Sequence, residues 1–533
     1  MYLSDVIKPV EYLNWGNADI YIQAPTGCGK THFILNEIIP MAVQQGKGIL
    51  ILCNRRNLLQ QYVTDIEKKE VDLLQHGDFR LHNYMRNGLL HVTTYQAVAE
   101  SIQIDQIIGR LEIIICDEVH ALYSDSQFAT GLYKAFIKII NWSISRLTMY
   151  VSATAEKIFP LLYTAKFQKM FPSLYCDQPD WSRHQSFPGY YQIDKCYDHC
   201  RVHYLHGIEQ ISTLIKNEQD IESKWMIFVP SIQEGKKIVN GLRQLGLKDV
   251  FLLTKESAAS ERGQRISNQL TSLHTFECKI LISTLVLEAG VSICGLDVNN
   301  IVNLHFGEDY FIQTLGRKRV GKDEKIDLYI MNRGKQFFAG KLNFCNQILK
   351  EVDVANYESR NPWKFQSYIS RRLLEQKGNE ALKSFLYWDE AFAINPISIS
   401  KAQQDSLFYK SILNKLDNDE NAFIKEQLAW MGVEDTYSSD NWVDEHKSER
   451  CRNELKAYFE KYVGGEPMDL KLFSEFKKTF AKILHEFYPD EQFRSNRSVS
   501  TKKLLQKIEE LGLPYTVSTK IVNRNKLYTI KQN

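Results

Sequence analysis

The 533-residue sequence predicts an α/β protein with two tandem domains built on parallel sheets, followed by a mostly helical region. Two observations predict this fold class. Short, nearly uninterrupted apolar runs rich in β-branched residues alternate with helical stretches, a pattern typical of parallel sheets buried on both faces. The alternation stops near residue 332, and the chain is longer than one hydrophobic core usually supports.

The first predicted domain covers residues 1–175. Its expected strands carry the β-branched and apolar side chains that suit a buried sheet. In chain order they are Asp19–Gln23, Gly48–Cys53, Leu111–Cys116 and Leu147–Ser152.

Residues 176–204 interrupt this pattern with two prolines and a glycine, which predicts a linker between domains. A second doubly wound α/β domain is expected at residues 205–335. Its predicted strands are Trp225–Val229, Val250–Leu253, Cys278–Ser283, Asn300–Leu304 and Ile326–Ile330.

The rest of the chain is predicted to form a helical region and a small terminal module. Residues 336–490 are rich in aromatic side chains, and both KFQSYISRRLLEQ and EALKSFLYWDEAF are expected to be helical. Within residues 491–533, Ser498 is placed to cap a helix that Gly512 and Pro514 end, and a β-like pair follows. A helix followed by a hairpin resembles a winged-helix-like module.

The tail from Arg494 onward carries nine basic and two acidic residues, a local charge of +7. Such a patch suits contact with phosphate groups. The alternative is a solvated face on a module that only packs against its neighbours, and both interpretations stay open. The whole chain has a formal charge of only +2, so its overall charge does not indicate a polyanionic partner.

Composition places the chain among folded proteins, because 44% of its residues are apolar and 24% are charged. The ten cysteines are scattered, a distribution that suits reduced thiols. The N-terminus lacks the charged and apolar segments of a signal peptide, and no apolar run is long enough for a membrane span. We therefore expect a cytoplasmic protein without membrane attachment.

The most specific local motif is APTGCGKT, which follows one predicted strand and opens a predicted helix. This is the context of a P-loop, in which backbone N–H groups surround the phosphates of a nucleotide. Lys30 is expected to reach the β- and γ-phosphates of ATP, and the Thr31 hydroxyl to ligate Mg²⁺. The predicted nucleotide-binding residues are Pro25, Thr26, Gly27, Cys28, Gly29, Lys30 and Thr31.

The second motif is Asp117-Glu118-Val119-His120, directly after a predicted strand. Carboxylates at the carboxyl end of a parallel strand are placed to serve a bound nucleotide. Asp117 is expected to hold Mg²⁺ through its water shell, and Glu118 to polarise the water that attacks the γ-phosphate.

Together these two motifs resemble those of superfamily two DEAD/DEAH-box-like helicases, with DEVH as a variant of the family's DExH motif. The resemblance covers about residues 20–335 and implies two tandem RecA-like domains with one ATP between them. It leaves the last 200 or so residues unexplained, and the adenine-reading glutamine motif of DEAD-box proteins is not evident.

Further segments of the first domain fit the resemblance. Ser152-Ala153-Thr154 resembles the motif that couples hydrolysis to nucleic-acid contact, with His120 of the DEVH motif in the same coupling role. The CNRRNLL and TTY segments resemble motifs that contact the phosphate backbone of nucleic acid. The resemblance implies such contacts for Arg55, Arg56 and Thr94.

The second domain carries the matching motifs. The resemblance implies nucleic-acid contacts for Ser231 and Thr284, and the same motif as Thr284 includes Glu288 and Gly290. The QTLGRKR segment resembles the family's arginine-finger motif. It implies that Gln313 orients the γ-phosphate or its water and that Arg317 and Arg319 stabilise transition-state charge, although Arg319 lies one residue before the family position.

A zinc site is a competing interpretation of another cluster. Cys196, His199, Cys200 and His203 could donate ligands. A second well-spaced pair is missing, however, and alternation along a strand would direct neighbours to opposite faces. This argument disfavours zinc.

These observations predict ATP hydrolysis coupled to movement along nucleic acid and to the unwinding of a duplex. DNA is favoured over RNA by the winged-helix-like tail alone, because backbone contacts do not separate the two. The alternatives are an ATPase that remodels nucleoprotein without unwinding and a nucleotide-switched binding module. Intact Lys30, Asp117, Glu118, Gln313 and Arg317 argue against the last of these.

Overall fold

The computed structural model describes residues 2–73, 81–82, 90–171, 181, 189–194, 197–217, 223–284, 292–321, 324–374, 380–443, 447–487, 499–511, 513–522 and 525–532. The chain divides into two compact units. The first contains Met1–His206, Ser223–Val239 and Asp249–Asn441, and the second contains Gly207–Glu222, Asn240–Lys248 and Trp442–Asn533. No helix of the described residues is both long enough and apolar enough to cross a bilayer.

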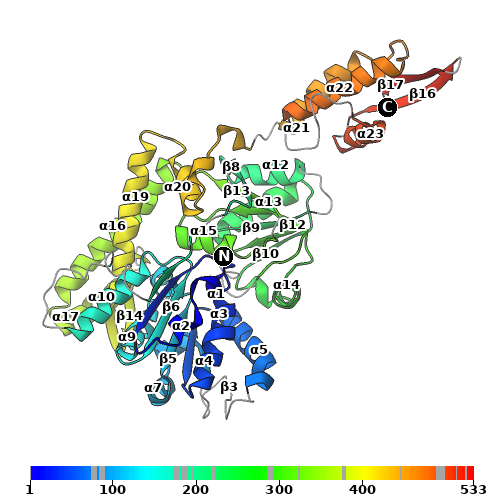
Figure 1. Ribbon diagram of the computed structural model, residues 1–533. Helices are drawn as coiled ribbons and strands as arrows, with labels where there is room; N and C mark the ends of the chain where they lie inside the picture. Colours follow the sequence, from blue (N-terminus) through cyan, green and yellow to red (C-terminus); the bar gives the residue numbers. More distant parts are fainter. Residues whose placement is uncertain are drawn as a thin grey trace. The chain divides into compact units, whose positions relative to one another are not determined.

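A seven-stranded sheet forms the centre of the N-terminal domain (Figure 1). All of its pairings are parallel. The four expected strands are confirmed to within two residues, and three further strands join them. In sheet order the strands are β3 (Leu81–His82), β4 (Leu90–Thr94), β2 (Ile49–Cys53), β5 (Ile113–Asp117), β6 (Leu147–Ser152), β1 (Asp19–Gln23) and β7 (Tyr190–Gln192).

Both faces of this sheet are covered, as the apolar runs predict. Along β1, Ile20 and Ile22 join one core cluster while Tyr21 joins the other, because successive side chains point to opposite faces. The first cluster draws on α1 (Leu3–Val6), α2 (Pro9–Tyr12), α3 (Lys30–Phe33), η1 (Ile34–Ile38), α4 (Ile39–Gln44) and α5 (Arg56–Leu73). The second draws on α6 (Tyr95–Glu100), α7 (Ile102–Ile107), η3 (Ile108–Arg110), α8 (Ala121–Ser124), α9 (Leu132–Ser143) and α10 (Ile158–Met170).

A six-stranded sheet, again wholly parallel, forms the second α/β domain. In sheet order its strands are β10 (Val250–Leu253), β11 (Ile280–Ser283), β9 (Lys224–Phe228), β12 (Val298–Asn303), β13 (Ile326–Met331) and β8 (Cys200–Leu205). The associated helices are α13 (Ile232–Gln244), η4 (Ser257–Ala259), α14 (Glu261–Ser272) and α15 (Glu308–Leu315).

The stretch expected to be a linker, 176–204, differs from that expectation. It contains β7, which pairs with β1 at the edge of the first sheet, and most of β8, which pairs with β13 at the edge of the second. The proline and glycine residues mark a break in the pattern. They do not reveal the short edge strands on either side of it.

The region after the second sheet is mostly helical, as expected, but it includes a β-hairpin. β14 (Leu386–Asp389) and β15 (Ala391–Ile394) pair antiparallel where the sequence predicted a helix. The run Leu-Tyr-Trp suits a strand, and Glu390 adopts φ 58° in the turn. The helices are α16 (Lys335–Glu358), α17 (Pro362–Leu374), α18 (Glu380–Lys383), α19 (Pro396–Leu416), α20 (Ala422–Trp430), η6 (Glu434–Thr436) and η7 (Ser439–Asn441).

This helical region packs against both α/β domains. α19 lies beside α16 (Figure 1), and at its start the Ser398 hydroxyl donates to the carbonyl of Ser126, 2.7 Å away, in the first domain. On α20, the ring of Trp430 lies 5.4 Å from that of Phe311 in the second domain. The region therefore links the two domains at a point close to the DEVH motif.

The second unit has its own core. It contains α12 (Glu209–Asn217), α21 (Lys447–Glu460), α22 (Leu470–Phe487), α23 (Thr501–Glu510), β16 (Tyr515–Val522) and β17 (Asn525–Gln532). Phe459 and Phe476 from α21 and α22 share one buried cluster with Leu504 and Tyr528 from the tail. The apolar side chains of the tail thus do not form a core of their own. They complete a core that begins near residue 451.

Candidate nucleotide-binding site

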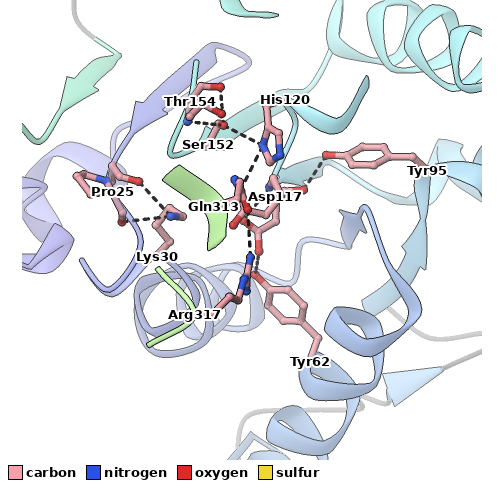
Figure 2. Close-up of polar contacts among 12 residues, drawn as sticks. Pro25, Lys30, Tyr62, Tyr95, Asp117, His120, Ser152, Thr154, Gln313 and Arg317 are labelled. Carbon is pink, nitrogen blue, oxygen red and sulfur yellow. Dashed lines mark hydrogen bonds and ion pairs between the residues drawn. The ribbon is translucent and has the colours of Figure 1, made fainter. Parts of the chain in front are cut away.

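The glycine-rich loop runs from the end of β1 to the start of α3. Gly27 and Gly29 adopt φ 91° and 78°, a left-handed conformation that only glycine adopts without strain. The Lys30 ammonium is buried and donates to the carbonyls of Ala24 and Pro25, at 3.0 and 3.2 Å. Figure 2 shows it folded over the loop.

The DEVH motif begins at the carboxyl end of β5, next to β6. The Glu118 N–H donates to Asp117 Oδ1 at 3.0 Å, and the Tyr62 hydroxyl donates to Oδ2 at 2.7 Å. Glu118 itself has φ 50°, which is uncommon for a residue with a side chain. Such strain is maintained only where the surroundings over-determine the conformation.

A chain of hydrogen bonds crosses from the second domain to this motif (Figure 2). From α15, Gln313 Nε2 donates to Glu118 Oε2 at 3.1 Å. Arg317, just after α15, donates from Nη2 to Gln313 Oε1 at 3.1 Å. All three side chains are buried, so solvent does not weaken these bonds.

His120 connects Glu118 to the end of β6. The Ser152 hydroxyl donates its one proton to the Thr154 carbonyl at 2.9 Å. His120 Nδ1 lies 3.1 Å from the same Ser152 Oγ, within hydrogen-bond distance. The same Nδ1 lies 3.4 Å from Glu118 Oε2, so a single imidazole edge connects the two segments.

The surroundings shift the pKa values of the two carboxyl groups, Asp117 and Glu118, in opposite directions. Burial and the adjacent Glu118 raise the pKa of Asp117 above its usual value, against the effects of Tyr62 and Lys30. Burial alone would also raise the pKa of Glu118, but Lys30, His120 and Arg317 outweigh it and lower that pKa. Glu118 is therefore an ionised carboxylate at neutral pH.

These residues surround a cavity of about 290 Å³ in the first unit. Both α/β domains contribute to its wall, which contains Lys30, Arg317 and Arg319 together with the two carboxylates. Glycine backbone, a lysine and a threonine hydroxyl are the groups that hold a triphosphate with Mg²⁺, so the donor set fits this ligand. The lining residues are Thr26, Gly27, Gly29, Lys30, Thr31, His32, Leu58, Gln61, Asp117, Glu118, Ser292, Arg317 and Arg319.

The turn after α15 approaches the glycine-rich loop closely. A Cβ added to Gly316 would lie 1.8 Å from the Thr26 hydroxyl, so only glycine fits at this point. Arg319 Nη1 lies 3.3 Å from the position of a Cβ on Gly27, and its Nε donates to the Ser292 hydroxyl at 3.1 Å. Arg319 thus reaches the cavity despite its one-residue offset from the motif.

The residues expected to contact nucleic acid have different surroundings. Arg56 is exposed, whereas Arg55 pairs with Asp125 at 2.8 Å. Thr94 is buried, and its hydroxyl accepts from the N–H of Ala97 at the start of α6.

The two candidates of the second domain, Ser231 and Thr284, are half-buried. The Ser231 hydroxyl accepts from the N–H of Glu234 at the start of α13, and Thr284 follows β11 directly. Glu288 and Gly290, which belong to the same motif as Thr284, lie outside the described residues.

Two features of the site were not predicted. Tyr62 carries no motif signal, because it is one of several apolar residues on the inner face of α5. Asp125 accepts from both Arg55 and the Tyr310 hydroxyl of α15, the latter at 3.1 Å, which joins the two domains a second time.

The zinc interpretation gains no support. Within the ranges given above, no three His, Cys, Asp or Glu side chains are grouped so that they could hold a metal ion. His203 Nε2 lies 2.9 Å from Asp327 Oδ1, and Cys196 is outside the described residues.

The match to a known sequence family lies in the first domain. The family model described as type III restriction enzyme, res subunit, matches residues 4–157. No curated protein matches the chain significantly in sequence.

Solved structures of helicases resemble the chain at low identity. S. cerevisiae Dbp5 bound to RNA and ADP BeF3 has 15% identity and a TM-score of 0.40, over 59% of this chain and 78% of that one. The Escherichia coli DEAH/RHA helicase HrpB has 16% identity and a TM-score of 0.41, over 63% and 43%. The DUF1998 helicase MrfA, bound to DNA and AMPPNP, has 15% identity and a TM-score of 0.41, over 60% and 46%.

The chain therefore spans less than half of the HrpB and MrfA structures. Identities this low assign neither a substrate nor an activity. The family match over residues 4–157 agrees with the resemblance predicted from the motifs of the N-terminal domain.

Proposed function

We propose that this protein is an ATP-dependent nucleic-acid motor, a helicase or translocase that hydrolyses one ATP between its two α/β domains. The observation that supports this most strongly is the bond from Gln313 to Glu118, with Arg317 behind it, beside a P-loop cavity. Groups that a hydrolytic site needs are thus divided between two domains.

The roles follow from the chemistry of each group. The glycine-rich loop and Lys30 hold the phosphates, and Thr31 and Asp117 hold Mg²⁺, which neutralises charge on the transferred phosphoryl group. Glu118 is ionised and orients the attacking water. Arg317 and Arg319 stabilise the charge that develops on the γ-phosphate oxygens.

Division of the site between two domains converts hydrolysis into movement. Lys30 and Glu118 belong to one domain and Arg317 to the other, so the reactive geometry depends on their approach. If each domain holds a nucleic-acid strand through its own residues, alternate closing and opening moves the strand past the protein. Arg56 on the first domain and Ser231 and Thr284 on the second are the proposed contacts.

The second unit is proposed to be a winged-helix-like nucleic-acid-binding module. Its order is α21, α22, α23 and the β16–β17 hairpin, and β17 also forms bridges to Val463 and Met468 between α21 and α22. Lys502 on α23 and Lys520 and Lys526 on the hairpin are exposed. DNA is the favoured substrate on this ground, with RNA as the alternative.

The first prediction concerns turnover. ATP hydrolysis by the purified protein should rise at least several-fold with single-stranded DNA, single-stranded RNA or duplex, and Lys30→Ala should abolish it by removing the phosphate cation. Steady-state phosphate release measures both. A rate that no polymer changes would favour a nucleotide switch, and substantial turnover by Lys30→Ala would refute the P-loop assignment.

The second prediction separates binding from chemistry. Glu118→Gln keeps the shape and the contact with Gln313 but removes the charge that orients water, so it should bind ATP with unchanged affinity and lose at least about 100-fold in turnover. Equilibrium binding and single-turnover hydrolysis test this. Glu112→Gln, a change outside the cavity, is the control, and equal losses in the two variants would contradict the assignment.

The third prediction concerns the second unit. Truncation at residue 494 would expose its core, so charge reversal is the cleaner change. The triple variant Lys502→Glu, Lys520→Glu, Lys526→Glu should weaken nucleic-acid binding and reduce the slope of log affinity against log salt by roughly one per lost phosphate contact. The control reverses the exposed Lys350, Lys364 and Lys410. If the two triple variants gave the same slope of log affinity against log salt, the module would have only a packing role.

A further inference from the structure

Tyr62 occupies a position that the P-loop and DEVH motifs do not explain. It lies on α5, its side chain is fully buried, and its hydroxyl donates to Asp117 Oδ2 at 2.7 Å. Tyr62 therefore holds the carboxylate of Asp117, one of the two residues proposed to hold Mg²⁺ (Figure 2).

The direction of this bond follows from elementary chemistry. A carboxylate oxygen only accepts, so the Tyr62 hydroxyl is the donor to Asp117 Oδ2.

Asp117 is fixed on three sides. Its Oδ1 accepts from the Glu118 N–H at 3.0 Å, its Oδ2 accepts from Tyr62, and its main-chain carbonyl accepts from the Tyr95 hydroxyl at 2.9 Å. Of the two tyrosines, only Tyr62 contacts the carboxylate. A side chain that hydrogen-bonds to a metal ligand orients that ligand. Losing such a side chain commonly lowers metal affinity by roughly 10–100-fold.

We propose that Tyr62 is a positioning residue of the Mg²⁺ site and holds the Asp117 carboxylate in the orientation that receives the ion with the nucleotide. This inference rests on the proposed ATPase function. Carboxylate and phosphate oxygens are ligands that Mg²⁺ prefers, which fits the carboxylate that Tyr62 holds.

The test compares Tyr62→Phe with Tyr95→Phe in the full chain. Each variant removes one buried hydroxyl and one bond to Asp117, so each loses similar packing and stability. Binding of a fluorescent ATP analogue is titrated with Mg²⁺ and measured separately in EDTA, and thermal unfolding is recorded for both variants.

We expect Tyr62→Phe to require roughly 10–100-fold more Mg²⁺ for half-maximal enhancement of nucleotide binding, while its affinity in EDTA stays within about twofold. Tyr95→Phe should keep the Mg²⁺ requirement of the unaltered chain. Equal Mg²⁺ requirements in the two variants, or an equal loss of affinity with and without Mg²⁺, would reduce Tyr62 to a structural role and overturn the inference.

A double variant tests whether Tyr62 acts on Mg²⁺ binding through Asp117. In an Asp117→Asn background, Tyr62→Phe should cause no further change in the Mg²⁺ requirement, whereas additive effects would contradict the proposal. If the unaltered chain binds nucleotide equally with and without Mg²⁺, the Mg²⁺ site and the proposed function fail together. If it depends on Mg²⁺ and Tyr62→Phe retains that dependence, only the role of Tyr62 fails.

Discussion

The ionised carboxylate of Glu118 is the group on which the arrangement of the site depends. It accepts a hydrogen bond from Gln313 of the second domain and lies near Lys30, His120 and Arg317, which lower its pKa. Removing a charge from water costs several kcal/mol unless partners compensate for it, on the order estimated for buried ions. The partners here come from both domains, so the stability of this carboxylate is coupled to how closely the domains approach.

Close approach imposes its own constraints on the sequence. Gly316 meets Thr26 where no side chain fits, and the loop glycines adopt φ values that other residues avoid. Glu118 adopts a positive φ, which strains its backbone at this position. The loop glycines and Glu118 follow the carboxyl ends of β1 and β5, where a parallel sheet brings together loops that are distant in the sequence.

Local patterns predicted much of this structure, and long-range contacts account for what they missed. The glycine-rich loop and the DEVH segment are short motifs whose strand and helix neighbours are visible in the sequence, so their location was predictable. The hairpin at Leu386–Ile394 was wrongly predicted as a helix, because its aromatic residues suit either structure and the turn at Glu390 needs a positive φ. Tyr62 could not be identified, since its hydrogen bond to Asp117 forms only when α5 packs against the sheet.

The measurement that tests the central claim most directly is single-turnover hydrolysis of bound ATP by Arg317→Ala, with nucleic acid present. The domains share one reaction if Arg317 stabilises the transition state, and loss of such an arginine should slow hydrolysis by about 10³- to 10⁵-fold. Affinity for ATP should change far less, because the P-loop of the first domain remains intact. Hydrolysis at the unaltered rate would show that the second domain takes no part in the chemistry and would contradict the account.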